Sequence, residues 1–170
     1  SKAAADAEEV ALAASGDLYV AYEQRHRIEQ FRGVSACRPE TLARPPVASH
    51  RIAEMAGWPA NGGAEAMAAP GDELLLLSEA APAGQDRRLG LRVRPGEAAR
   101  TFSWKLPAGG YQPTAMELFE GGDGRTHLLV LHRKASILGG LSAALGEAVL
   151  DPETGLPGAG RTVARLRLPL

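Results

Sequence analysis

Short apolar stretches separated by turn-forming residues recur along the whole chain. The clearest is AEAMAAPGDELLLLSE, residues 64–79, in which two apolar runs flank the turn Pro-Gly-Asp-Glu. Gly and Asp supply the positive φ and the side-chain capping that a tight turn between antiparallel strands needs. Related stretches lie at residues 7–23, AEEVALAASGDLYVAYE, and 113–133, PTAMELFEGGDGRTHLLVLHR. The pattern predicts three β-hairpins of one kind.

Two segments after the second hairpin alternate between apolar and polar positions. Leu89, Leu91 and Val93 share one face of the first segment, and Phe102 and Trp104 share one face of the second. Strict alternation is typical of a strand with one buried face. The middle unit is therefore predicted to have four strands, at residues 64–69, 73–79, 88–95 and 99–106.

Helix signals are few. Residues 49–58 are predicted to form one short helix, with Ser49 as its N-cap and Gly57 as its stop. Residues 137–150 are rich in small side chains and Gly, and they fit a loop followed by a strand as readily as a helix.

A four-stranded antiparallel unit that repeats about every 40–50 residues is typical of a propeller blade. We expect an all-β, β-propeller-like fold with about three four-stranded antiparallel blades, that is, a partial propeller. The whole chain, 1–170, is taken as one domain with units at about 7–50, 51–110 and 111–170. Since three blades cannot close a ring, we expect missing blades or a second copy of the chain to complete it.

Composition narrows the function classes. Apolar residues make up 45% of the chain and charged residues 23%, which is typical of a globular protein. A net charge of −1 gives no electrostatic reason to expect nucleic acid as a partner. No apolar run approaches the roughly 18 residues of a membrane span. Cys37 is the single cysteine, which excludes an internal disulfide and a zinc site built from cysteines.

Acidic residues recur where the predicted hairpins begin. Glu8, Glu65 and Thr114 are equivalent by pattern, with spacings of 57 and 49 residues. In a propeller the innermost strand of each blade starts near the central channel, so such positions converge. Several converging carboxylates suit a hard cation such as calcium. Glu8, Glu9 and Glu65 are therefore candidate metal ligands; alternatively, the first two are solvated at a frayed end and Glu65 caps a turn.

The ends of the second strands carry further candidates. Glu23, Glu79 and His132 fall at equivalent ends, and Arg133 follows the last of them. The two glutamates are able to support metal ligands or to act as a general base, whereas surface charge is the simpler interpretation. His132 and Arg133 are able to offset the charge of a phosphate oxyanion, or they belong to an ordinary basic loop.

Other sequence signals are weaker. Arg25 and His26 form a second basic group after Glu23, and Asn61 and Thr114 are further candidates to line a channel. Motifs of serine hydrolases, zinc proteases and phosphate-binding loops are missing from the chain.

The stretches DLYVAYEQRHRIEQF, NGGAEAMAAPGDELLLLSE and GGYQPTAMELFEGGDGRTHLLVLHRKAS resemble the esterase-like phytase family, which comprises bacterial proteins with a propeller fold. The resemblance spans residues 8–136. It implies calcium that binds and polarises phosphate, a small phosphorylated substrate, and a periplasmic or secreted location. The chain departs from the family at His132, where an acidic residue is frequent.

Two functions follow from these observations. The first is a calcium-assisted phosphoesterase or esterase-like hydrolase, in which a nearby glutamate takes a proton from the attacking water. The second is a non-catalytic propeller module that binds a ligand or a protein, and the missing acid in the third unit favours it. Fold analogy alone does not decide between them.

Overall fold

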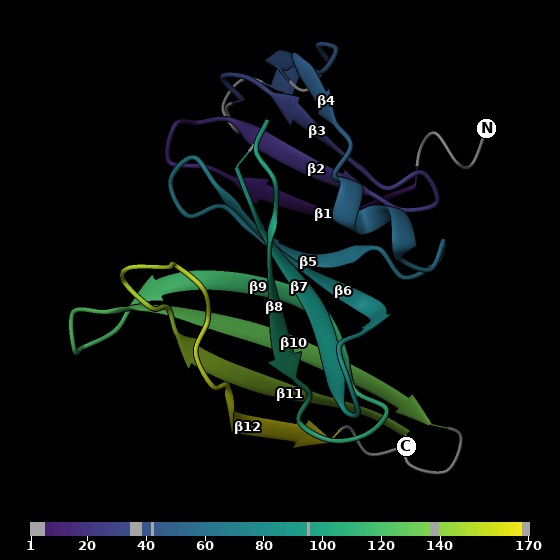
Figure 1. Cartoon of the computed structure of the whole chain (residues 1–170), viewed down its shortest axis with the longest axis vertical. Coiled ribbons are helices and arrows are strands. Elements are labelled where there is room, and N and C mark those ends of the chain that lie inside the picture. Colours follow the sequence, from purple (N-terminus) through teal and green to yellow (C-terminus); the bar gives the residue numbers. More distant parts are fainter. Residues whose placement is uncertain (1–5, 35–38, 42, 95, 137–139, 168–170) are drawn as a thin grey trace.

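The computed structural model describes residues 6–34, 39–41, 43–94, 96–136 and 140–167, and it shows an all-β protein (Figure 1). Three antiparallel sheets of four strands each follow one another along the chain. The strands are β1 (Ala7–Leu12), β2 (Leu18–Tyr22), β3 (Arg27–Phe31) and β4 (Ala48–His50); β5 (Ala64–Ala68), β6 (Leu74–Pro82), β7 (Arg87–Val93) and β8 (Arg100–Lys105); β9 (Gln112–Glu120), β10 (Thr126–Ser136), β11 (Gly140–Val149) and β12 (Arg161–Arg167).

Each sheet is a meander whose strands lie in the order of the chain. Gly-rich and Asp-rich hairpin turns make most of the connections within the sheets, whereas longer segments join β3 to β4 and β11 to β12. The first strands β1, β5 and β9 lie next to one another, and the sheets stack in chain order (Figure 1). The described residues form no closed ring. The predicted partial propeller-like arrangement is therefore confirmed.

The middle sheet is buried on both faces. In β6, Leu74 and Leu76 pack in the core between the first and second sheets, whereas Leu75 and Leu77 pack in the core between the second and third. A strand covered on both sides needs apolar residues at every position, not at alternate ones. This explains the continuous run of four leucines and makes the second sheet the centre of the structure.

The outer faces of the two end sheets carry exposed apolar side chains. Val10 and Leu12 of β1 point away from the second sheet, because their neighbour Ala11 belongs to the core on the other side. On the third sheet, Leu131 and Leu141 are exposed in the same manner. The stack of described sheets is therefore open at both ends.

A buried polar contact joins the second and third sheets. The Trp104 indole Nε1–H donates to Nε2 of His132 at 2.9 Å, and His132 Nδ1 donates to the carbonyl of Ala144 at 3.3 Å. Both ring nitrogens of His132 are thus occupied, and its side chain has no exposed area. Burial lowers the pKa of His132 to about 4, so this histidine is neutral near pH 7.

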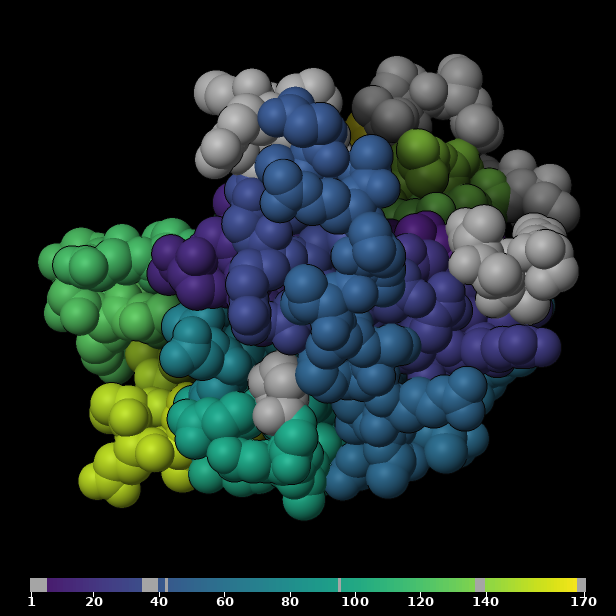
Figure 2. Space-filling model, turned by 90° about the horizontal axis from the view of Figure 1, so that it is seen from above, coloured from purple at the N-terminus to yellow at the C-terminus, as the bar shows by residue number. Residues whose placement is uncertain are grey.

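The loop between β11 and β12 docks on the second sheet. The Arg92 and Arg100 side chains both donate to the carbonyl of Thr154. Gly155 follows in the left-handed region, with φ of 61°, and a β-carbon there would collide with the Arg92 guanidinium. Figure 2 shows this yellow loop beside the blue-green end of the second sheet.

The helix predicted at residues 49–58 is only partly confirmed. Ser49 lies in β4, and the helical part is a single 3₁₀ segment, η3 (Ala53–Gly57), whose N-cap Ile52 offers no side-chain hydrogen bond. The other short helix is η2 (Pro39–Thr41). Residues 140–149 form β11, and 137–139 lie outside the described residues. Nowhere in the described chain is there a helix of the length and apolar character that a membrane crossing requires.

We predict that Trp104→Phe destabilises the protein more than Trp58→Phe does. The first change leaves the buried His132 Nε2 without a donor, which costs about 1–3 kcal/mol. Trp58 is a matched control, since it is equally buried and its indole nitrogen has no hydrogen-bond partner among the described residues. Melting temperatures measure the difference, at roughly 2–4 °C per kcal/mol. Equal losses in the two variants would contradict the role given to this bond.

Candidate functional site

Each sheet contains an irregularity at the same place, where the first strand pairs with the second. In each sheet one residue of the first strand has no partner in the ladder of the second strand. This residue is Glu8 in β1, Glu65 in β5 and Thr114 in β9. A β-bulge of this kind kinks the strand and re-aims the side chain of the extra residue. The structure therefore places the three residues at equivalent positions, as their spacing in the sequence predicts.

The register of the second strands shows that one of the equivalences predicted from the sequence is wrong by one residue. Arg133, rather than His132, occupies the counterpart of Glu23 and Glu79 in the third sheet. His132 is its neighbour on the opposite face and points into the core. The strands of the third hairpin are longer than those of the first, so counting from turn to turn misplaces the site by one residue. Because side chains alternate between the two faces of a strand, a shift of one residue moves the predicted position to the opposite face.

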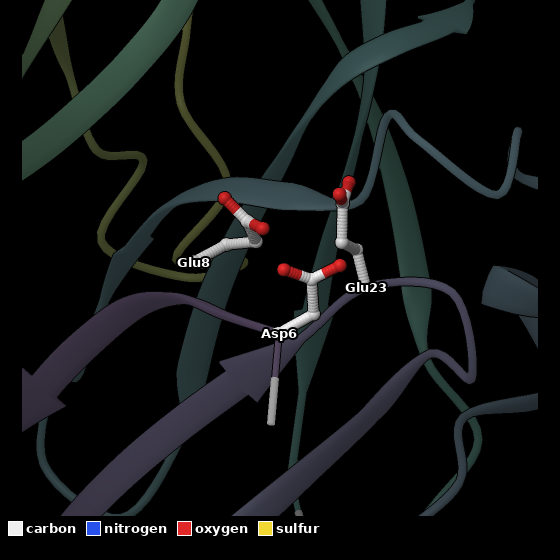
Figure 3. A group of neighbouring side chains, drawn as sticks. All are labelled: Asp6, Glu8 and Glu23. Atoms are coloured by element: carbon white, nitrogen blue, oxygen red, sulfur yellow. The ribbon is translucent and has the colours of Figure 1, made fainter. Parts of the chain in front are cut away.

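Three carboxylates converge at the start of the first sheet. One oxygen each from Asp6, Glu8 and Glu23 lies within 4.8 Å of the other two, and all three side chains are partly buried. Figure 3 shows them on the ends of β1 and β2, with their carboxylates turned into one region. Like charges so close together are unfavourable unless a proton or a cation offsets them.

Glu65 extends this cluster from the second sheet. Burial raises the pKa of Glu65 to about 7, with further contributions from Glu79, Glu8 and Glu23, while Arg133 acts in the opposite direction. A hydrogen bond from Glu65 lowers the pKa of Glu8, although burial and the neighbouring Glu23 raise it overall. Near neutral pH Glu65 is therefore partly protonated, and its proton offsets part of the repulsion between β1 and β5.

Arg133 brings the third sheet into contact with the cluster. Its guanidinium lies 3.4 Å from a carboxylate oxygen of Glu79, whose side chain is only 14% exposed. Arg133 itself is 55% exposed and therefore has donors left for a ligand. The site combines four carboxyl groups, Asp6, Glu8, Glu23 and Glu65, with one glutamate–arginine pair at its edge.

Three other residues singled out from the sequence lie apart from the cluster. Glu9 accepts a hydrogen bond from the backbone of Val10 at 2.8 Å, and burial together with Glu117 raises its pKa. Thr114 donates to the carbonyl of Leu131 at 3.4 Å. Asn61 accepts from Gln24 at 3.1 Å and so links the segment before β5 to the turn between β2 and β3.

Asp6 is the one candidate residue of the carboxylate cluster that the sequence did not indicate. It precedes β1, and its counterparts in the other sheets are Gly63 and Gln112, so the repeat gives it no acidic equivalent. Its backbone carbonyl accepts from the amide of Glu23 at 3.2 Å, which extends the β1–β2 ladder and holds both side chains together. Its position two residues before the repeated Glu8 was the available signal.

We predict that Glu65→Gln stabilises the metal-free protein at pH 8 but not at pH 5. Since the folded-state pKa is raised above its ordinary value, the native protein loses stability as the pH rises from about 4.5 to 7, and the amide removes this loss. After allowance for solvent screening, we expect a rise of about 2–4 °C in the melting temperature at pH 8. A gain of the same size at both pH values, or an equal gain in the exposed control Glu120→Gln, would contradict the assignment.

Comparison with known proteins identifies the family of the chain. A family model described as "Phytase-like: Esterase-like activity of phytase" matches residues 1–167. No curated protein and no solved structure matches the chain. The family agrees with the three-sheet fold and with a carboxylate-rich site at the first strands. The chain belongs to the phytase-like family, and at the level of that family it is an esterase-like, phytase-type hydrolase.

Proposed function

We propose that the protein is a calcium-assisted hydrolase of phosphate esters, and that its site is the carboxylate cluster between β1, β2 and β5. The observation that carries the proposal is the convergence of Asp6, Glu8 and Glu23, whose ligand atoms lie within 4.8 Å of one another. Glu65 and the Glu79–Arg133 pair surround this group from the second and third sheets. The family supplies the hydrolase class, and the substrate class and the metal are our proposal.

The donor set fits calcium. All of the ligand atoms are carboxylate oxygens, which a hard cation prefers, and no soft ligand is part of the group. Calcium takes six to eight oxygen ligands, so three or four carboxylates leave positions for water and for a substrate oxygen. The pKa of Glu65 is raised mainly by burial, and the neighbouring carboxylates add to the shift, so part of it reflects negative charge that a cation would offset.

The residues around the cluster have distinct roles in this proposal. When bound, calcium polarises a phosphoryl oxygen and lowers the pKa of a coordinated water. Arg133 offers two parallel N–H donors to the remaining phosphate oxygens, a geometry that a guanidinium matches well. Glu79 lies against Arg133 and takes the proton from the attacking water. Glu23 completes the ligand set from the end of β2.

Glu65 holds a proton at the place where the reaction needs one. Its pKa of about 7 is close to the value at which a carboxyl group both gives and takes a proton near neutral pH. The leaving alcohol of a phosphate ester requires a proton, and Glu65 is positioned beside Glu8 to provide it. His132 has no part in this scheme, since it is buried and both of its ring nitrogens are bonded.

We predict that millimolar calcium raises the melting temperature of the protein, whereas Glu8→Gln and Glu23→Gln abolish the rise. A cation bound only by the native state adds about 2.7 kcal/mol of stability at a hundred times its dissociation constant. Calorimetry with calcium, magnesium or a chelator measures this effect. Glu120→Gln is the control and should keep the full rise. An unchanged melting temperature in the parent protein would remove the metal from the proposal.

We predict that Glu79→Gln and Arg133→Gln each lower the hydrolysis of 4-nitrophenyl phosphate by about 10²-fold or more, while they leave the calcium-dependent rise in melting temperature intact. The neighbouring Lys134→Gln serves as the control, because Lys134 bonds the carbonyl of Gly109 away from the cluster. Parallel assays with 4-nitrophenyl acetate separate phosphate esters from carboxylic esters. Calcium binding without turnover of either ester would instead establish a non-catalytic binding module.

A further inference from the structure

A cavity of about 600 Å³ lies beside the carboxylate cluster, at the same end of the first sheet. One wall is the turn between β2 and β3, which begins with Gln24 at φ of 62°. The other wall is the chain after β4, because the pairing of Ile28 with His50 brings Arg51 next to that turn. This second segment, in blue, belongs to the face shown in Figure 2. The cavity is lined by Gln24, Arg25, His26, Arg51, Ile52, Ala53 and Ala56.

The charged groups of this cavity are all cationic. Arg25 and Arg51 line it, and no carboxylate does. Neither guanidinium has an ion pair or a side-chain hydrogen bond with any residue of the described ranges. The nearby Arg27 differs, since it lies 2.8 Å from Glu29 and over the ring of Tyr22. Arg25 and Arg51 therefore keep their donors for a molecule that carries negative charge.

Part of the cavity is apolar, and both of its walls are anchored to the rest of the protein. Ile52, Ala53 and Ala56 form its floor, and the 3₁₀ segment that carries them is anchored by Met55 and Trp58 in the core. On the opposite wall, His26 Nε2 lies 3.1 Å from the carbonyl of Pro59, so the β2–β3 turn is tied to the same segment. A volume of this size falls within the range of small-molecule sites, which are mostly apolar with a few placed polar groups.

We propose that this cavity binds a small organic anion, with its phosphate or carboxylate group between Arg25 and Arg51 and its apolar part over Ile52, Ala53 and Ala56. The proposal does not rest on calcium or on hydrolysis. The cavity nevertheless shares a wall with the cluster: a β-carbon on Gly63 would lie 3.0 Å from Glu23 Cβ and 3.3 Å from His26 Nδ1. Gly63 thus packs against both His26 of the cavity and Glu23 of the cluster.

The test uses metal-free protein in the presence of a chelator, so that the result is independent of the proposed calcium site. Phenyl phosphate, benzoate, inorganic phosphate and benzyl alcohol are titrated by calorimetry, and the imidazole resonances of the four histidines are followed by NMR. We expect saturable binding of phenyl phosphate or benzoate, a shift confined to His26, and no binding of the uncharged alcohol. The first two ligands distinguish a phosphate from a carboxylate as the favoured group.

Variants then locate the site. Arg25→Gln and Arg51→Gln should each weaken binding by at least about 10-fold, since each removes one charged partner of the anion. Arg44→Gln, an exposed arginine outside the cavity, should leave the affinity unchanged. The absence of saturable binding, equal affinity in the Arg25 and Arg51 variants, or equal binding of benzyl alcohol would overturn the proposal.

Discussion

Burial of the second sheet on both faces is the constraint from which the rest of the structure follows. The four leucines of β6 fill the cores on its two sides, and the first and third sheets are placed by packing against them. Once the three sheets are stacked, the strands β1, β5 and β9 must lie side by side. The carboxylates at their starts are then brought together by packing elsewhere, because their own interaction opposes the approach.

The electrostatic repulsion between these carboxylates is reduced because some of the acidic groups of the site are protonated or paired. Glu65 holds a proton, Glu79 is paired with Arg133, and Asp6, Glu8 and Glu23 remain as the most negative part. On β10 the buried His132, which bonds Trp104 of β8, directly precedes Arg133 and points to the opposite face. One strand therefore supplies a bond that joins two sheets and a charge that faces the site. Residues with perturbed charge concentrate where binding or catalysis takes place.

Much of the fold could be predicted from the sequence, since alternation and turn residues are local signals. The four strands of the middle sheet agree with the pattern at residues 64–106, and the equivalence of Glu8, Glu65 and Thr114 follows from the repeat. The residues of the candidate site were harder to predict from the sequence. Both His132 and Arg133 are candidates, but the pattern makes His132 the equivalent of Glu79 because hairpin length varies. Asp6 has no acidic counterpart in the repeat. The cavity at Arg25 and Arg51 depends on the pairing of β3 with β4, which no local pattern shows.

The bulge at the start of each sheet has a consequence for how such a protein changes over time. A residue that is extra to the ladder is released from the demands of core packing and strand pairing, so its side chain is free to vary. Glu, Glu and Thr already stand at the three positions. Exchanging one of them alters the ligands that a blade presents and leaves the blade itself intact. The scaffold can thus acquire or lose chemistry one blade at a time.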